Sequence, residues 1–105
     1  IVMNAEKILS IYPNKIPVIV SKDAKCKDLE NLEKCKFLVS HDMTLGQFIY
    51  IIRNNLKLDS KKAIFLFIEN KYIESTSNKF DQIYEKHKSD DSYLYLTYTT
   101  ENTFG

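Results

Sequence analysis

The stretch that most constrains the fold is HDMTLGQFIYIIRNNLKL, residues 41–58. Its apolar side chains at positions 45, 48, 49, 52 and 56 recur at the spacing of one helix face, which predicts an amphipathic helix. Thr44 and Gln47 have the spacing of a capping box, in which each side chain accepts a hydrogen bond from the other residue's backbone N–H. The sequence therefore predicts one long helix that begins directly after Thr44.

Strands are predicted on both sides of this helix. Residues 15–21 form a β-branched run with Pro17, which cannot donate a ladder hydrogen bond, so this point faces an edge or a bulge. Residues 34–39 predict a second strand, antiparallel to the first, and residues 93–99 predict a last strand. Residues 63–68 (AIFLFI) are apolar on both faces, which predicts a central strand covered on each side.

Two short helices complete the pattern, one over residues 5–11 that stops before Pro13 and one over residues 80–87. The order helix, strand, strand, helix, strand, short helix, strand predicts an α+β fold, a ubiquitin-like β-grasp with a four-stranded mixed sheet and an N-terminal helical extension. We expect a single ubiquitin-like domain over residues 1–105, with a truncated helical arm (1–12), a β-grasp core (13–98) and a flexible tail (99–105).

Composition limits the function classes. The chain has 105 residues, 44% of them hydrophobic, which is typical of one small soluble domain. A formal charge of +1 argues against nucleic acid as a partner and against bulk attraction to an anionic membrane. No signal peptide or membrane-spanning run is present, so a cytoplasmic protein is expected. Cys26 and Cys35 lack metal-site or redox spacing, so we expect reduced thiols, no metal and no cofactor.

Several blocks carry a more specific signal, and they follow one another along nearly the whole chain. They are EKI from Glu6, YPNKIPVIV from Tyr12, KFLV from Lys36, DMTLGQFIYIIR from Asp42, AIFLFIEN from Ala63, IYEKHKSDDSYLYLTY from Ile83 and the final ENTFG. Taken together they closely resemble the autophagy ubiquitin-like modifiers, the light-chain-3 and GABARAP family. The resemblance extends collinearly from about Glu6 to Gly105.

The resemblance implies a protein that is the substrate of a ubiquitin-like cascade and has no active site of its own. Gly105 would be adenylated with ATP, passed as a thioester between an activating and a conjugating enzyme, and joined to phosphatidylethanolamine. A glycine suits a narrow catalytic cleft because it has no Cβ and unrestricted φ. Two acyl chains are enough for stable membrane anchoring. Whether a protease first exposes Gly105 stays open.

The location that the resemblance implies depends on the lipid. The unconjugated protein would be cytoplasmic, and the lipidated form would be bound to the autophagosome membrane. Fourteen of the 15 basic residues are lysine, which indicates an AT-rich genome. If that genome is apicomplexan, the analogy places the lipidated form on the plastid of that lineage, the apicoplast.

The resemblance also implies a second function, the docking of receptor or adaptor proteins through short peptide motifs. An extended peptide with an aromatic residue and, three positions later, an aliphatic one would add as a strand to the edge of the second strand. The aromatic pocket would be lined by Ile8, Pro17, Lys36, Leu38 and Tyr93, and the aliphatic pocket by Phe37, Val39, Met43, Phe48 and Ile51. For Phe48 and Ile51 an ordinary core role is the alternative.

Charged residues are expected around these pockets. Lys7, Lys15 and Lys36 would form a basic rim that attracts acidic residues flanking the motif, which raises association rates more than affinity. Arg53 matches the family's helix arginine that pairs with such acids. Asn54 and Asn55 stand where relatives often carry further basic residues, so selection for acidic flanks should be weaker here. Ser40 replaces a proline that relatives usually have at the rim of the aliphatic pocket.

Two other classes of function are alternatives for a chain with this sequence. One is an unconjugated β-grasp module that binds motif peptides without being joined to a lipid. The other is an enzyme with a thiol site, since His41 lies next to Asp42 and the chain has His87 and two cysteines. No spacing assembles these side chains into a triad, so polar surface is the better interpretation. The protein is therefore expected not to be an enzyme.

Overall fold

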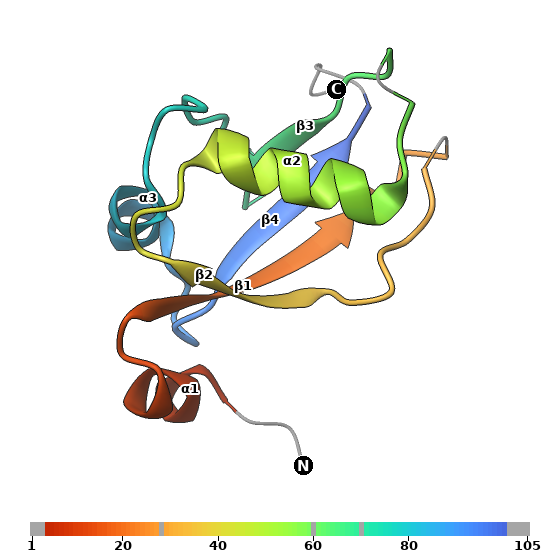
Figure 1. Ribbon diagram of the computed structural model, residues 1–105. Helices are drawn as coiled ribbons and strands as arrows, with labels where there is room; N and C mark the ends of the chain where they lie inside the picture. Colours follow the sequence, from red (N-terminus) through yellow and green to blue (C-terminus); the bar gives the residue numbers. More distant parts are fainter. Residues whose placement is uncertain (1–3, 28, 60, 70, 101–105) are drawn as a thin grey trace.

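The computed structural model describes residues 4–27, 29–59, 61–69 and 71–100. The elements follow the order expected from the sequence: α1 (Ala5–Ile11), β1 (Lys15–Lys22), β2 (Lys36–Ser40), α2 (Leu45–Leu56), β3 (Phe65–Ile68), α3 (Phe80–His87) and β4 (Leu94–Thr99). Figure 1 shows α2 lying across the sheet and α1 apart from it, beside the start of β1. This is the predicted α+β, ubiquitin-like fold with an N-terminal helix.

The sheet is mixed and four-stranded, in the order β2-β1-β4-β3. β1 and β4 run parallel at its centre, and each pairs antiparallel with an outer strand, β1 with β2 and β4 with β3. In the described part of the chain, no strand pairs with the second edge of β2. That edge leaves backbone N–H and C=O groups available to another strand.

The prediction for residues 63–68 is wrong in one respect, because β3 is an edge strand and not a central one. Its side chains are nevertheless buried on both faces, with Leu66 and Phe67 each less than 5% exposed. Apolar side chains on both faces of a strand indicate that both faces of the sheet are covered. They carry no information on whether a strand pairs on one side or on two.

Pro17 lies inside β1, at a point where its missing N–H costs no ladder hydrogen bond. Val20 donates to the Cys35 carbonyl (2.8 Å), and pair types alternate along an antiparallel ladder. Pro17 and Leu38, which oppose each other, therefore form a pair without backbone hydrogen bonds. The pairing of β1 with β4 begins only at Val18, so the backbone nitrogen of Pro17 faces a position that β4 does not reach. Although β1 is a central strand, it is therefore unpaired on this side at Pro17, as the sequence predicted for this point.

The core lies between α2 and the face of the sheet that we call the inner face. It includes Val18, Leu96 and Tyr98 from the two central strands, together with Phe48 and Ile52 from α2, all of them at most 1% exposed. Phe48 is in edge-to-face contact with Phe37 (centroids 5.4 Å apart) and with Phe80 (5.2 Å). We call the opposite side, toward which Pro17 and Leu38 point, the outer face.

Among the described residues, no helix is both long enough and apolar enough to cross a lipid bilayer.

Candidate functional site

A hollow of about 390 Å³ lies on the outer face, beside the free edge of β2. It brings together residues from four separate segments of the chain, including all five that were predicted for the aromatic pocket. We call it the outer hollow, and it is lined by Ile8, Tyr12, Pro17, Lys34, Lys36, Phe37, Leu38 and Tyr93. The sequence interpretation missed Tyr12 and Lys34, although Tyr12 lies four residues after Ile8, the spacing of one helix face.

The outer hollow combines apolar walls with lysine ammonium groups. Leu38 is 43% exposed although it is aliphatic, and Tyr12 is 47% exposed. The Lys36 Nζ lies 6.0 Å from the centroid of the Tyr93 ring, a cation–π distance. A hollow of this kind suits a large planar apolar group, with cationic groups beside it for any neighbouring acid.

Asp91 holds the Tyr93 side of this hollow in place. Its Oδ1 accepts from the Tyr93 backbone N–H (3.0 Å), and its Oδ2 accepts from the Tyr95 hydroxyl. The hydrogen bond from Tyr95, followed by the one from the Tyr93 backbone, lowers the pKa of Asp91 below its ordinary value. The same bond to the carboxylate raises the pKa of Tyr95 to about 12. The start of β4 is thus fixed by a pair of charge-assisted hydrogen bonds.

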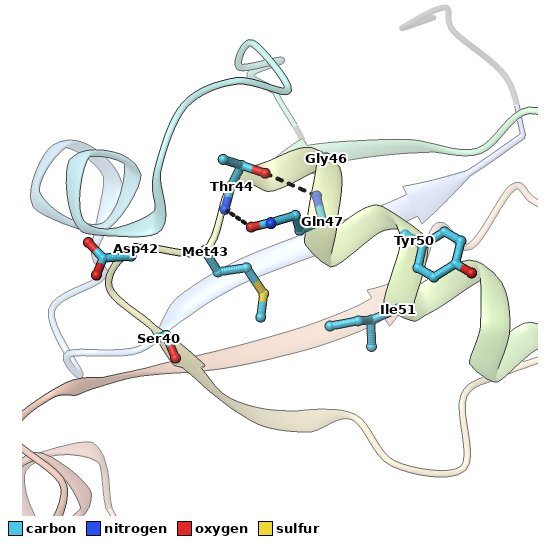
Figure 2. A pocket seen from close by; sticks show the side chains of 8 residues that line it. All are labelled: Ser40, Asp42, Met43, Thr44, Gly46, Gln47, Tyr50 and Ile51. Carbon is cyan, nitrogen blue, oxygen red and sulfur yellow. Dashed lines mark hydrogen bonds between the residues drawn. The ribbon is translucent and has the colours of Figure 1, made fainter.

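A second hollow, of about 770 Å³, lies between the end of β2 and the first turns of α2. Figure 2 shows Met43 and Ile51 directed toward the same space, while Tyr50 points outward from the helix. We call it the inner crevice, and it is lined by Ser40, Asp42, Met43, Thr44, Gly46, Gln47, Tyr50 and Ile51. It therefore includes two of the five residues predicted for the aliphatic pocket.

Of the other three residues predicted for the aliphatic pocket, Val39 and Phe48 lie deeper, and Phe37 lines the outer hollow instead. Val39 is 2% exposed and Phe48 is 1% exposed, so both are core residues in the unbound protein. Phe37 is half-buried, and its ring packs perpendicular to that of Phe48. None of these three side chains lines the crevice, so their part in an aliphatic pocket stays a prediction. For Phe48 the core role that was the alternative is observed, whereas Ile51 is half-buried and lines the crevice.

The first turn of α2, which forms one wall of the crevice, is fixed by two sets of contacts. Thr44 and Gln47 form the predicted capping box, with N–H to oxygen distances of 3.2 and 2.9 Å (Figure 2). The Gly46 N–H donates to the Thr76 carbonyl at 2.9 Å. A Cβ on Gly46 would lie only 3.2 Å from that oxygen, so a glycine allows the loop before α3 to approach the helix.

The predicted basic residues have different surroundings. Lys15 donates from Nζ to the Ser40 hydroxyl at 3.1 Å, next to the crevice. Lys7 is exposed on α1. Arg53 donates to the Lys62 and Asp59 carbonyls, so its guanidinium braces the chain after α2 and leaves other N–H groups for a partner. The pairing of Arg53 with acidic flanks stays a prediction.

The predicted conjugation residue, Gly105, lies outside the described residues. The described chain ends at Thr100, and Thr99, which the sequence interpretation assigned to the tail, is the last residue of β4 and is buried. Within the described ranges, no three His, Cys, Asp or Glu side chains come together as metal ligands. His87 lies 3.9 Å from a Glu74 carboxylate oxygen and stacks on Tyr72, far in sequence from either cysteine.

Comparison with known proteins points to one family. The family described as "Autophagy protein Atg8 ubiquitin like" matches residues 2–105. "Autophagy-related protein 8e" of Arabidopsis thaliana is 46% identical over 101 residues, which cover 96% of this chain and 81% of that protein. "Autophagy-related protein 8" of Schizosaccharomyces pombe is also 46% identical over 101 residues, covering 96% of this chain and 82% of the relative.

Proposed function

This chain belongs to the Atg8 family of autophagy ubiquitin-like proteins, which are modifiers and not enzymes, and we propose that it acts in two ways within that family. It docks short aromatic-x-x-aliphatic motifs of receptor proteins on the free edge of β2. It is also conjugated through Gly105 to phosphatidylethanolamine. The observation that carries the docking proposal is the outer hollow, which lies directly beside that unpaired edge.

The geometry of β2 supports docking because its two faces serve two hollows. Side chains alternate along a strand, so Leu38 faces the outer hollow while Val39 faces the core beneath the crevice. An added strand obeys the same alternation. Residues three positions apart point to opposite faces, so an aromatic side chain can enter the outer hollow while the aliphatic one enters the inner crevice. The backbone of β2 supplies the hydrogen bonds.

The conjugation proposal rests on membership of the family and on the match of Gly105 to its conjugated glycine. Its partners are the activating and conjugating enzymes of the autophagy cascade, and its acceptor is the amine of phosphatidylethanolamine. The ATP-derived acyl adenylate is replaced by a thioester and then by an amide, with AMP and the enzyme thiol as leaving groups. The product carries two acyl chains, enough to move a domain from the cytoplasm to an autophagosome membrane.

Docking is tested by titrating a labelled aromatic-x-x-aliphatic peptide against the purified protein and its Leu38→Arg variant. Arginine at this exposed position places a charge in the outer hollow, so we expect affinity to fall at least tenfold, about 1.4 kcal/mol, with an unchanged unfolding midpoint. Ile73→Arg is the matched control, because Ile73 is 54% exposed and lines none of the hollows described here. Equal loss in both variants would contradict the proposed site.

Conjugation is tested with the two purified enzymes, ATP and vesicles that contain phosphatidylethanolamine. Mass spectrometry should find the lipid adduct on the wild-type chain and none on Gly105→Ala. An adduct that forms equally well on Gly105→Ala would contradict the assignment. Peptide docking without any adduct on the wild type would favour the unconjugated β-grasp module instead.

A further inference from the structure

The described chain leaves the sheet at Thr100, directly after β4. The strand registers place the end of β1 and the start of β3 beside the end of β4 (Figure 1). Two segments therefore flank the point where the chain leaves the sheet. They are the loop after β1, residues 22–30, and the last turn of α2 with the loop before β3, residues 53–64. We call these two segments the tail end.

The tail end carries an excess of positive charge in an otherwise acidic molecule. Its two segments hold seven of the 15 basic residues and four of the 14 acidic ones, a formal net charge of +3. The remaining eight basic and ten acidic residues give −2, and the two parts together give the +1 of the whole chain. The small charge of the whole chain is therefore compatible with a positive field at one end.

The lysines of the tail end are exposed, whereas two of its aspartates bond to their own loops. Asp23 accepts through Oδ1 from the Lys25 backbone N–H at 3.3 Å. Asp59 accepts in the same way from the Lys61 backbone N–H at 3.0 Å. The exposed lysines of the two segments are Lys25, Lys27, Lys57, Lys61 and Lys62.

The chemistry of this surface suits phospholipid headgroups better than it suits a protein. Protein interfaces are enriched in aromatic residues and depleted of lysine. Among the described residues of the tail end, no large hydrophobic side chain is exposed. A lysine ammonium is a compact point charge on a flexible stem, and each one held close to an anionic bilayer strengthens binding. Lysines without an apolar anchor favour a reversible electrostatic contact with such a bilayer.

We propose that the tail end is a membrane-contacting face that binds anionic phospholipid headgroups. The inference rests on the proposed conjugation, which brings this face to a bilayer. Residues 101–105 separate the described chain from the lipid, and five extended residues span at most about 17 Å. Charges are screened beyond about 8 Å at physiological salt. A tether of this length holds the lysines close enough to the headgroups for direct contact.

This orientation keeps both docking hollows away from the bilayer. Tyr93 of the outer hollow directly precedes β4, whereas the tail end lies beyond the last residue of that strand. The six residues of β4 separate the two by roughly 20 Å, at 3.3 Å per residue. The inner crevice lies at the first turn of α2, and the tail end begins at the last turn. A conjugated chain held on its tail end therefore presents both hollows to receptors.

The test measures partition of the purified, unconjugated chain onto vesicles of phosphatidylcholine alone or mixed with phosphatidylserine. We expect wild type to bind the vesicles with phosphatidylserine about tenfold more tightly. The Lys25→Gln, Lys61→Gln double variant should reduce this preference to about twofold or less. The matched control, Lys7→Gln with Lys71→Gln, removes the same charge from exposed positions outside the tail end and should keep the preference.

The outcomes separate this inference from the proposed conjugation. Equal partition of wild type onto the two kinds of vesicle overturns the inference, and so does an equal loss in the control variant, because net charge then explains the effect. The vesicles contain no phosphatidylethanolamine and no enzyme is present, so these results do not depend on whether Gly105 is conjugated. A vesicle preference in a chain that forms no lipid adduct would overturn conjugation and leave a reversible membrane contact.

An acidic protein surface is the other partner that exposed lysines could meet. If the Lys25→Gln, Lys61→Gln variant keeps the vesicle preference of wild type but is conjugated more slowly by the two enzymes, the tail end serves an enzyme. That result would overturn the membrane proposal.

Discussion

The outer hollow and the inner crevice lie on opposite sides of one strand, but they are built differently. The inner crevice is lined by a single stretch, from Ser40 to Ile51, whose shape follows from the helix cap at Thr44. The outer hollow is assembled from α1, β1, β2 and the start of β4. A local site needs only its own segment to be folded, whereas an assembled one also depends on how its segments dock.

The largest effect is expected in the core, with Phe48→Ala, directly after the crevice residue Gln47. Phe48 is 1% exposed and contacts two aromatic rings, so the substitution leaves a cavity and should reduce the free energy of unfolding by about 3–5 kcal/mol. Urea denaturation followed by far-ultraviolet circular dichroism measures this. A loss below about 1 kcal/mol would contradict the core role of Phe48.

The dependence of the outer hollow on the docking of α1 is tested most directly with Ala5→Glu. Ala5 is the residue of α1 that is buried, at 1% exposure, and a carboxylate there should release the helix because an unpaired buried charge is costly. Loss of Ile8 and Tyr12 from the hollow should weaken an aromatic motif peptide about tenfold or more.

The rest of the fold should survive Ala5→Glu, which amide proton–nitrogen spectra would show as unchanged peaks for α2. Ser10→Glu changes an exposed position of the same helix and serves as the control. If peptide binding is equally tight in Ala5→Glu, α1 does not contribute to the hollow.

Much of this arrangement follows from patterns along the chain. Apolar spacing together with Thr44 and Gln47 predicted α2, and the helix begins at Leu45 as expected. The five residues of the aromatic pocket were placed by resemblance, since nothing in the spacing of Ile8 and Tyr93 shows that they meet. The edge position of β3 was missed because burial of strand faces does not reveal strand neighbours.

The local character of the crevice is tested with Thr44→Ala. The loss of the cap removes the hydrogen bond from the Gln47 N–H, which should reduce the free energy of unfolding by about 1 kcal/mol. Thr44→Ser keeps a hydroxyl and should recover most of the lost free energy of unfolding. Peptide contacts in the outer hollow should be unaffected, so a change at Tyr93 in chemical-shift mapping would mean that the two sites are coupled.

The smallest effect is expected in the pH dependence of stability, through Asp91 and Tyr95 at the start of β4. Because the pKa of Asp91 is lowered in the folded chain, its contribution to stability is present above about pH 4 and is lost as pH falls through the lowered pKa. The pKa of Tyr95 is raised to about 12, so its contribution is present below about pH 10 and is lost as pH rises toward that raised pKa. The hydrogen bond between these two side chains is the largest cause of both pKa shifts.

Tyr95→Phe removes that bond, so urea midpoints should fall less steeply between pH 5 and pH 3 in the variant than in the wild type. Tyr50→Phe, at a side chain that is 65% exposed, is the control. Parallel pH profiles for the wild type and Tyr95→Phe would show that Asp91 is held by the Tyr93 backbone alone.

The two edges of the sheet also differ in what they allow between molecules. At the end of β3, Ile68 and Tyr72 exchange backbone hydrogen bonds of 2.7 and 3.0 Å, so Tyr72 occupies this end of the outer edge. β2 is only five residues long and begins at a lysine. Growth of a fibril requires two long complementary edges on each molecule. If β2 docks a peptide as proposed, a sheet with one short receptive edge and one edge obstructed at its end accepts a single guest strand at a time, even where many copies are crowded on a surface.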